Sequence, residues 1–346
     1  MSKNTAYIVA ATRTACGKAN KGSLRFTRPD SMGGEVVKDL LNRTKGLEAE
    51  QVEDVIMDCA LPKASQGLNM ARQIALLGGL PDSVPGVTVN RFCSSGLQTI
   101  AMAAERIMAG GADVIIAGGV ESMSLVPMGG MSFQPNPDLV DEKPGVYGSM
   151  GITAENVAKK YDVSREDQDE FAYQSHKRAI KAWEQGKFEG QITPIKVHEK
   201  KVTADGEVVE DSFTFKQDEG PRKDTSVEAL SGLRPAFKSD GSVTAGNSSQ
   251  MNDAAAGVVV VSGEMVEKLG LEPMARYVGF QVAGVAPEIM GIGPVEAVPK
   301  VLKKSGLQLS DIDLIELNEA FASQSLAVIR KLGLDKEITN VNGGAI

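Results

Sequence analysis

The pattern of hydrophobic and polar positions along the chain predicts an α/β protein. Short apolar runs, typical of buried strands, occur at residues 6–11, 55–60, 84–90, 113–118, 254–262 and 275–286. Helical patterns occur at residues 94–109, 164–185 and 295–304. This alternation is typical of sheets covered by helices. Because residues 94–109 are apolar on nearly every side, we expect that helix to be buried.

The character of the sequence changes between residues 121 and 250. Loops rich in Pro and Gly precede a charged helix, and a polar, hairpin-like stretch follows at 197–215. We therefore predict three parts. An N-terminal half at 1–120 is completed by 252–272, an inserted loop domain occupies 121–251, and a C-terminal half occupies 273–346.

A weak internal repeat relates two segments of the chain. Residues 55–90 and 314–342 each read as an apolar strand, a helix and a second strand that ends in Asn. In this alignment Asn90 matches Asn342, and Cys93 matches Ala345. The first copy continues into a further helix and strand, whereas the second ends one residue later. We therefore expect the second half to be incomplete.

Composition excludes several classes of protein. The hydrophobic share of 42% and charged share of 24% are ordinary for a globular protein. A net charge of −8 argues against general binding to nucleic acid. With 3 cysteines and 2 histidines, neither a disulfide framework nor a metal site is expected. We find no secretory signal and no apolar stretch of membrane-spanning length, so we expect a cytoplasmic protein.

Cys93 is the first candidate for chemistry. It follows a predicted strand and begins an apolar helix, within Asn90-Arg-Phe-Cys-Ser-Ser-Gly96. The unsatisfied N–H groups of a helix start favour a thiolate by lowering the pKa of the thiol. The alternative is an inert packing cysteine, which we favour for Cys16 and Cys59. We expect His176 and His198 to lie on solvated surface.

Seven segments carry candidate motifs: residues 90–96, 119–123, 150–155, 233–237, 244–249, 318–321 and 340–346. In this order they resemble motifs of the thiolase family, and the resemblance covers the whole chain. It implies a thiolase fold, in which two similar βαβαβαββ halves form five αβαβα layers with an inserted loop domain, the second half being incomplete here. A nicotinamide dehydrogenase is disfavoured because no Gly-x-Gly-x-x-Gly follows a strand.

The resemblance implies that Cys93 takes up an acyl group and passes it to coenzyme A. We expect thiolytic cleavage of 3-ketoacyl-CoA to acetyl-CoA and a shortened acyl-CoA, as in fatty acid β-oxidation. Ser149 stands where the biosynthetic branch tends to carry His, which favours this direction. The alternatives are a biosynthetic acetoacetyl-CoA thiolase and a non-catalytic protein that binds CoA or lipid. A β-ketoacyl synthase is disfavoured by the motif at 318–321.

The resemblance also implies roles for further residues. Asn318 would hold a water in an oxyanion hole, although Asn also commonly caps a helix. Arg222 would reach the nucleotide end of CoA, and Ser249 would bind its pantetheine arm. The remaining candidates would line or shape the substrate tunnel: Met150, Phe237, Ala245, Met290, Ala320 and Phe321.

The resemblance implies no metal and no permanently bound cofactor, with CoA acting as a substrate. It further implies a homodimer or homotetramer, with a β-oxidation partner subunit as an additional possibility, and no membrane span.

The family's Gly-His-Pro and second-Cys motifs would follow Ile346. We expect the chain to be part of a longer active enzyme, the alternative being a shortened, inactive protein. Without a further helix and its flanking strands, large apolar faces would meet water. We therefore expect residues 1–346 by themselves to be neither stable nor active.

Overall fold

The computed structural model describes residues 5–203 and 205–346, which form two compact units. The first comprises the chain up to Phe133, together with Glu189–Glu219 and Met251–Val278. The second comprises Gln134–Phe188, Gly220–Gln250 and Gly279–Ile346. The three-part division drawn from the sequence stays a prediction.

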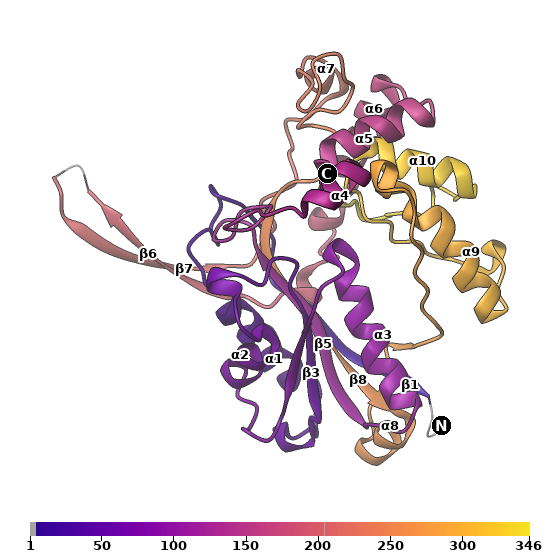
Figure 1. The fold of residues 1–346 in the computed structure, drawn as a ribbon. Coiled ribbons are helices and arrows are strands. Elements are labelled where there is room, and N and C mark those ends of the chain that lie inside the picture. The colour runs from indigo at the N-terminus through magenta and orange to yellow at the C-terminus, as the bar shows by residue number, and fades with distance from the viewer. Residues whose placement is uncertain (1–4, 204) are drawn as a thin grey trace. The chain divides into compact units, whose positions relative to one another are not determined.

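A mixed sheet forms the centre of the first unit (Figure 1). Its strands lie in the order β4-β3-β5-β8-β1-β9, with β2 paired to β8. β3 pairs in parallel with β4 and with β5, and the other pairings are antiparallel. The strands are β1 (Ala6–Arg13), β2 (Gly17–Lys18), β3 (Asp54–Asp58), β4 (Gly86–Val89), β5 (Val114–Ser122), β8 (Asn252–Ser262) and β9 (Ala275–Arg276).

Helices cover both faces of this sheet. On one face, Ile107 of α3 packs with Ile115 and Val260. On the other, Gly257 faces α1, where an added Cβ would lie 3.0 Å from Leu40. Strands covered on both faces read as continuous apolar runs, which explains the sequence of β5. The helices are α1 (Pro29–Arg43), α2 (Met70–Leu77), α3 (Ser95–Met108) and α8 (Gly263–Leu269), with short 3-10 turns η1 (Ala49–Gln51), η2 (Ala64–Gln66), η3 (Phe92–Ser94) and η5 (Glu189–Gln191).

The expectation that the helix after Cys93 is buried on nearly every side is wrong. α3 buries the face that meets the sheet, but Leu97 is 65% exposed and Met108 is 40% exposed on its outer face. Apolar residues all around a helix therefore did not require burial all around it.

The predicted polar hairpin is confirmed. β6 (Ile195–Val202) and β7 (Val208–Phe215) form an antiparallel ladder that extends away from the main sheet of the first unit (Figure 1). His198 lies on its exposed side, as expected.

The second unit is mainly helical, and α10 (Ala322–Leu332) lies at its centre. Residues 322–329 of α10 are buried. Ser323 Oγ donates to the carbonyl oxygen of Ala154 at 3.1 Å, which joins α10 to α5. Among the described residues, no helix combines the length and the apolarity that crossing a membrane requires. The other elements are α4 (Pro137–Glu142), η4 (Pro144–Tyr147), α5 (Met150–Lys160), α6 (Arg165–Glu184), α7 (Val227–Ser231), η6 (Pro287–Ile292), α9 (Gly293–Ser305) and η7 (Leu309–Asp311).

The internal repeat is visible in the topology. β3 and β4 pair in parallel and are connected through α2, and Ile315 forms a parallel bridge with Thr339, connected through α10. The strands predicted at 314–319 and 338–342 are reduced to this isolated bridge.

The strand predicted at 275–286 is wrong beyond its first two residues. β9 pairs with β1 at Ala275 and Arg276. In the described chain no strand lies beside the residues that follow, and an extended segment needs such a partner to form a ladder.

Ile115→Ala is expected to lower the free energy of unfolding of the first unit by about 2–5 kcal/mol. Ile115 is fully buried, so the shorter side chain leaves a cavity in the core. Urea denaturation measures the change. Leu76→Ala, at a residue that is 44% exposed, is the matched control and should change stability far less. Equal losses in the two variants would contradict this assignment of the core.

Candidate functional site

Cys93 lies in a strained turn between β4 and α3. It belongs to η3, and the preceding Phe92 has φ 47°, in the left-handed region that residues other than glycine rarely adopt. Asn90 Oδ1 accepts from the Phe92 N–H at 2.9 Å, and Asn90 Nδ2 donates to the Ala60 carbonyl at 2.9 Å. Ser95 Oγ donates to the Phe92 carbonyl at 2.7 Å. These bonds hold a conformation that the backbone would otherwise avoid.

The net effect of this environment on the Cys93 thiol is opposite to our expectation. Cys93 is an exposed residue, but loss of hydration around its thiol raises the pKa of Cys93. The backbone N–H of Cys93 lowers that pKa, and the carboxylates of Asp58 and Glu121 raise it. The predicted net lowering is therefore wrong, because the start of the helix is outweighed by burial and nearby negative charge.

Asp58 and Glu121 are residues that the sequence analysis missed. They lie at the ends of the neighbouring parallel strands β3 and β5. Burial, followed by the charge of Glu121, raises the pKa of Asp58 to about 7, and burial also raises the pKa of Glu121. The available signal was that each acidic residue ends an apolar strand, and the ends of adjacent parallel strands meet at one edge of a sheet.

Cys16 and Cys59 differ from Cys93 in exposure, because Cys59 is buried and Cys16 is half-buried, whereas Cys93 is exposed. Burial raises the pKa of Cys16 to about 11 and that of Cys59 to about 12. Both thiols are therefore poor nucleophiles near neutral pH.

Four of the predicted tunnel residues gather in the second unit. The rings of Phe237 and Phe321 meet edge to face, with centroids 6.0 Å apart at 81°. Met150 and Ala320 pack on the same small core as Phe321. An added Cβ at Gly151 would lie 2.1 Å from the Phe237 ring, so glycine at this position is what lets the ring rest on α5.

Ser249 lies directly beside this cluster. Its backbone N–H donates to the carbonyl oxygen of Ala320 at 2.9 Å, next to a bridge between Ser248 and Phe321. Ala245 is exposed in the same loop. Met290 is 45% exposed in η6, which is held to α5 by a hydrogen bond from Asn156 Nδ2 to the Glu288 carbonyl.

Asn318 is exposed, and no hydrogen bond of its side chain is found within the described residues. The helix-capping alternative is wrong, because the N-cap residue of α10 is Phe321, whose N–H donates to Gln324 Oε1. The side-chain amide of Asn318 therefore does not cap the start of α10.

The neighbouring Glu319 is buried and fixes the segment that follows residue 340. Its carboxylate accepts from Ser175 Oγ at 2.6 Å, from Asn340 Nδ2 at 2.8 Å and from the Ile346 N–H at 3.4 Å. Ser175 Oγ in turn accepts from the Gly344 N–H at 3.1 Å. Glu319 thus ties residues 340–346 to α6.

The expectation that His176 is solvated is wrong. It faces the interior from α6 and is 5% exposed, because a charged helix still has an inner face when it packs on a core. Its Nδ1 accepts from the backbone N–H of Arg222 at 3.3 Å. The Arg222 side chain is 60% exposed and pairs with Asp224 at 3.4 Å.

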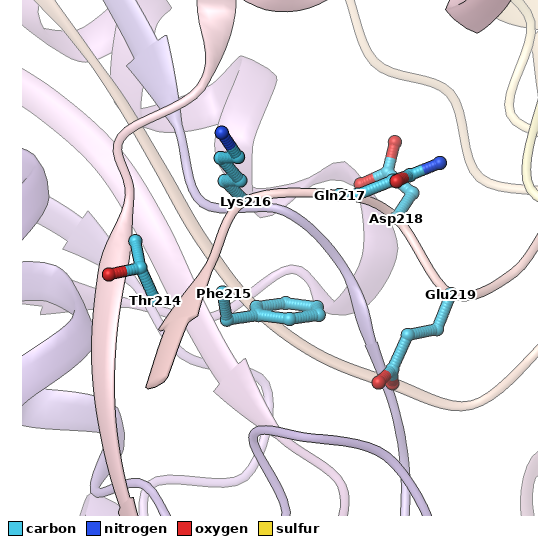
Figure 2. A pocket seen from close by; sticks show the side chains of 6 residues that line it. All are labelled: Thr214, Phe215, Lys216, Gln217, Asp218 and Glu219. Carbon is cyan, nitrogen blue, oxygen red and sulfur yellow. The ribbon is translucent and has the colours of Figure 1, made fainter. Parts of the chain in front are cut away.

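A shallow, open pocket on the surface of the first unit is not part of this chemistry. It has a volume of about 360 Å³ and is lined by residues 214–219 (Figure 2). Asp218 pairs with Arg13 at 2.8 Å, and Glu219 accepts from the Lys18 N–H and from Ser23. These carboxylates connect the segment after β7 to the rest of the unit, which is a structural role.

The candidate residues therefore fall into two groups. Cys93, Asp58 and Glu121 belong to the first unit, whereas Asn318 and the predicted CoA-binding residues belong to the second.

Comparison with known protein families matches almost the whole chain. The thiolase N-terminal domain matches residues 6–264, and the thiolase C-terminal domain matches residues 271–346.

Known relatives and structures agree with these matches. The chain is 56% identical over 341 residues to a 3-ketoacyl-CoA thiolase of Bacillus subtilis, covering 99% of this chain and 87% of the relative. It is 45% identical to an acetyl-CoA acetyltransferase of Escherichia coli, covering 98% and 86%. The crystal structure of the dimeric peroxisomal thiolase of Saccharomyces cerevisiae aligns with a TM-score of 0.88 at 39% identity, covering 100% and 86%. The α/β fold is therefore that of the thiolases, as the sequence predicted.

Glu319→Ala is expected to loosen residues 340–346, because it leaves buried donors of Ser175 and Asn340 without their acceptor, at about 1–3 kcal/mol for each group. Hydrogen exchange at residues 340–346 measures this loosening. Glu316→Ala is the matched control, since Glu316 lies three positions earlier, is exposed, and forms none of these hydrogen bonds. Unchanged exchange in Glu319→Ala would contradict the anchoring role.

Proposed function

The chain belongs to the thiolase family, and on this premise we propose that Cys93 accepts the acyl group during thiolytic cleavage of a 3-ketoacyl-CoA. Thiolases transfer acyl groups to and from coenzyme A, and the chain is an acyltransferase of this kind. The observation that carries the assignment of Cys93 is its exposed place in a strained turn at a strand end, followed by the start of a helix. Cys16 and Cys59 lack this setting.

In the proposed reaction, Cys93 Sγ attacks the C3 keto carbonyl of the substrate. Cys93 gives up the proton of its thiol, the C2–C3 bond breaks, its electron pair goes to C2, and C2 takes up one proton to give acetyl-CoA. The acyl group remains on Cys93 as a thioester until the thiol of a second CoA attacks it and frees the cysteine. Backbone N–H groups at the start of the helix suit the stabilisation of the oxyanion formed in each attack.

We assign the CoA-facing role to the second unit. The exposed amide of Asn318 can bind a water or a carbonyl oxygen, and the cluster of Met150, Phe237 and Phe321 offers apolar contact to the pantetheine and acyl chain. Arg222 is an exposed cation that suits a phosphate of the nucleotide. Ser249, Ala245, Met290 and Ala320 keep their proposed roles around this cluster.

The degradative direction is the one we favour. The higher identity to the 3-ketoacyl-CoA thiolase of B. subtilis supports it, whereas the acetyl-CoA acetyltransferases at 44–48% identity support the biosynthetic alternative. A protein that binds CoA without catalysis remains the alternative from another class, and the experiment below separates it from an enzyme.

We also propose that the protein is a homodimer in the cytoplasm. The yeast thiolase that it resembles is described as dimeric. β4 is the edge strand of the described sheet, and an unpaired edge beside the Cys93 turn is suited to pairing with another chain. A tetramer and a β-oxidation partner subunit stay predictions.

Incubation with acetoacetyl-CoA is expected to add one acetyl group to Cys93, in a thioester that hydroxylamine removes. Peptide mass spectrometry measures the adduct on each cysteine, so Cys16 and Cys59 serve as internal controls. Cys93→Ser should form no hydroxylamine-labile adduct. A protein that binds acetoacetyl-CoA yet shows no adduct on Cys93 would support the binding protein and contradict the enzyme.

A further inference from the structure

Two carboxyl groups lie together at the carboxyl ends of the neighbouring strands β3 and β5, close to the turn that holds Cys93. Asp58 ends β3 and pairs in register with Gly119 of β5, two residues before Glu121. An added Cβ at Gly119 would lie 2.3 Å from Asp58 Cγ, and one at Gly96 would lie 3.5 Å from Asp58 Oδ2. The Asp58 carboxyl therefore occupies the space between β5 and the first turn of α3, directly after Cys93 in the chain.

Glu121 is held in place as the second member of this pair. One of its oxygens accepts from Gln66 Nε2 at 2.6 Å, and the other accepts from the Ala60 N–H at 2.7 Å. Asp58 receives a backbone hydrogen bond from Val120. These donors are neutral, so they fix the carboxyls without cancelling their charge.

Basic side chains do not offset the pair within the described residues. Lys63, in the loop that follows Asp58, and Arg91, just before Cys93, are exposed and form no ion pair with either carboxyl. The charged group at the other end of β3, Asp54, is paired with Arg106. Two like charges in a poorly hydrated place disfavour each other, and both disfavour any further anion nearby.

Cys93 is that further anion. When it ionises, its thiolate meets burial and the two carboxylates, all of which raise its pKa, and its own backbone N–H, which lowers it. The same two carboxylates raise the pKa of Cys59, the residue next to Asp58.

We propose that the Asp58–Glu121 pair is an electrostatic restraint on Cys93, which keeps the nucleophile a thiol until the charge of Asp58 is removed. Asp58 is a positioning residue in this account, because it acts on the ionisation of Cys93 and needs no contact with the substrate. The inference deepens the proposed function and rests on Cys93 being the nucleophile.

The sign of the coupling follows from the direction of each shift. The pKa of Asp58 is raised, so the group is neutral below about pH 7 and carries its charge above it. Once charged, it opposes ionisation of Cys93, which takes place at higher pH. Removing that charge should therefore lower the pKa of Cys93.

Alkylation of Cys93 by iodoacetamide, followed by peptide mass spectrometry between pH 6 and pH 10, tests this restraint. In Asp58→Asn the midpoint of the rate against pH should fall by about half a pH unit or more, which is about threefold more thiolate at pH 7.5. Because a less basic thiolate is also less nucleophilic, the rate there should rise about twofold. Asp82→Asn, at a side chain that is 98% exposed, removes one charge from the same unit and should leave the midpoint unchanged.

A structural effect gives a different result. If Asp58→Asn merely opened the turn, alkylation would speed up at every pH without a shift of the midpoint, and this outcome would overturn the proposal. Glu121→Gln should shift the midpoint in the same direction, and it decides the question if Asp58→Asn does not fold. If the folded variants keep the wild-type midpoint, the proposed restraint is overturned, but the proposed enzymatic function is not. If the midpoint shifts but Cys93 forms no acetyl adduct, the proposed enzymatic function is overturned, and the electrostatic effect of the pair on Cys93 is retained.

Discussion

The hydrogen bonds of Asn90 and Ser95 hold the turn on which the placement of Cys93 depends. Phe92 adopts a left-handed conformation there, which costs on the order of 1–3 kcal/mol for a residue with a side chain. The side chains of Asn90 and Ser95 bond the backbone of Phe92 on both sides, and Asn90 also bonds Ala60 at the end of β3. The sheet therefore supports the turn, and the turn presents the cysteine at the start of α3.

The same position brings opposing electrostatic effects together. Parallel strands place Asp58 and Glu121 at the edge of the sheet to which the turn is attached, so the geometry that presents Cys93 also surrounds it with negative charge. A helix start by itself contributes on the order of 0.3–1 kcal/mol in favour of an anion. Here burial and the carboxylates outweigh it, and the pKa of Cys93 is raised. Cys93 therefore ionises less readily than an exposed thiol would.

Hydrophobic periodicity was enough to predict the strands β1, β3, β5 and β8 and the helix α3, because these elements bury one face or both. The hairpin of β6 and β7 was predicted instead from its polar sequence, and most of β7 is exposed. Periodicity failed where a neighbour decides the outcome. Residues 277–286 lack a partner strand, and His176 is buried because of what packs on α6. The family motifs predicted the cluster around Phe321, but Asp58 carries no motif, and its proximity to Glu121 depends on the order of the strands.

In the proposed reaction, the hydrogen-bonded turn at residues 90–95 presents Cys93 for acyl transfer. The most direct test is the single-turnover rate of Cys93 acetylation from acetyl-CoA in Asn90→Ala, with folding checked by circular dichroism. The acetylation rate of Asn90→Ala should be at least about tenfold lower than that of the wild type, because the nucleophile is no longer held in position. A folded Asn90→Ala protein that acetylates Cys93 at the wild-type rate would contradict it.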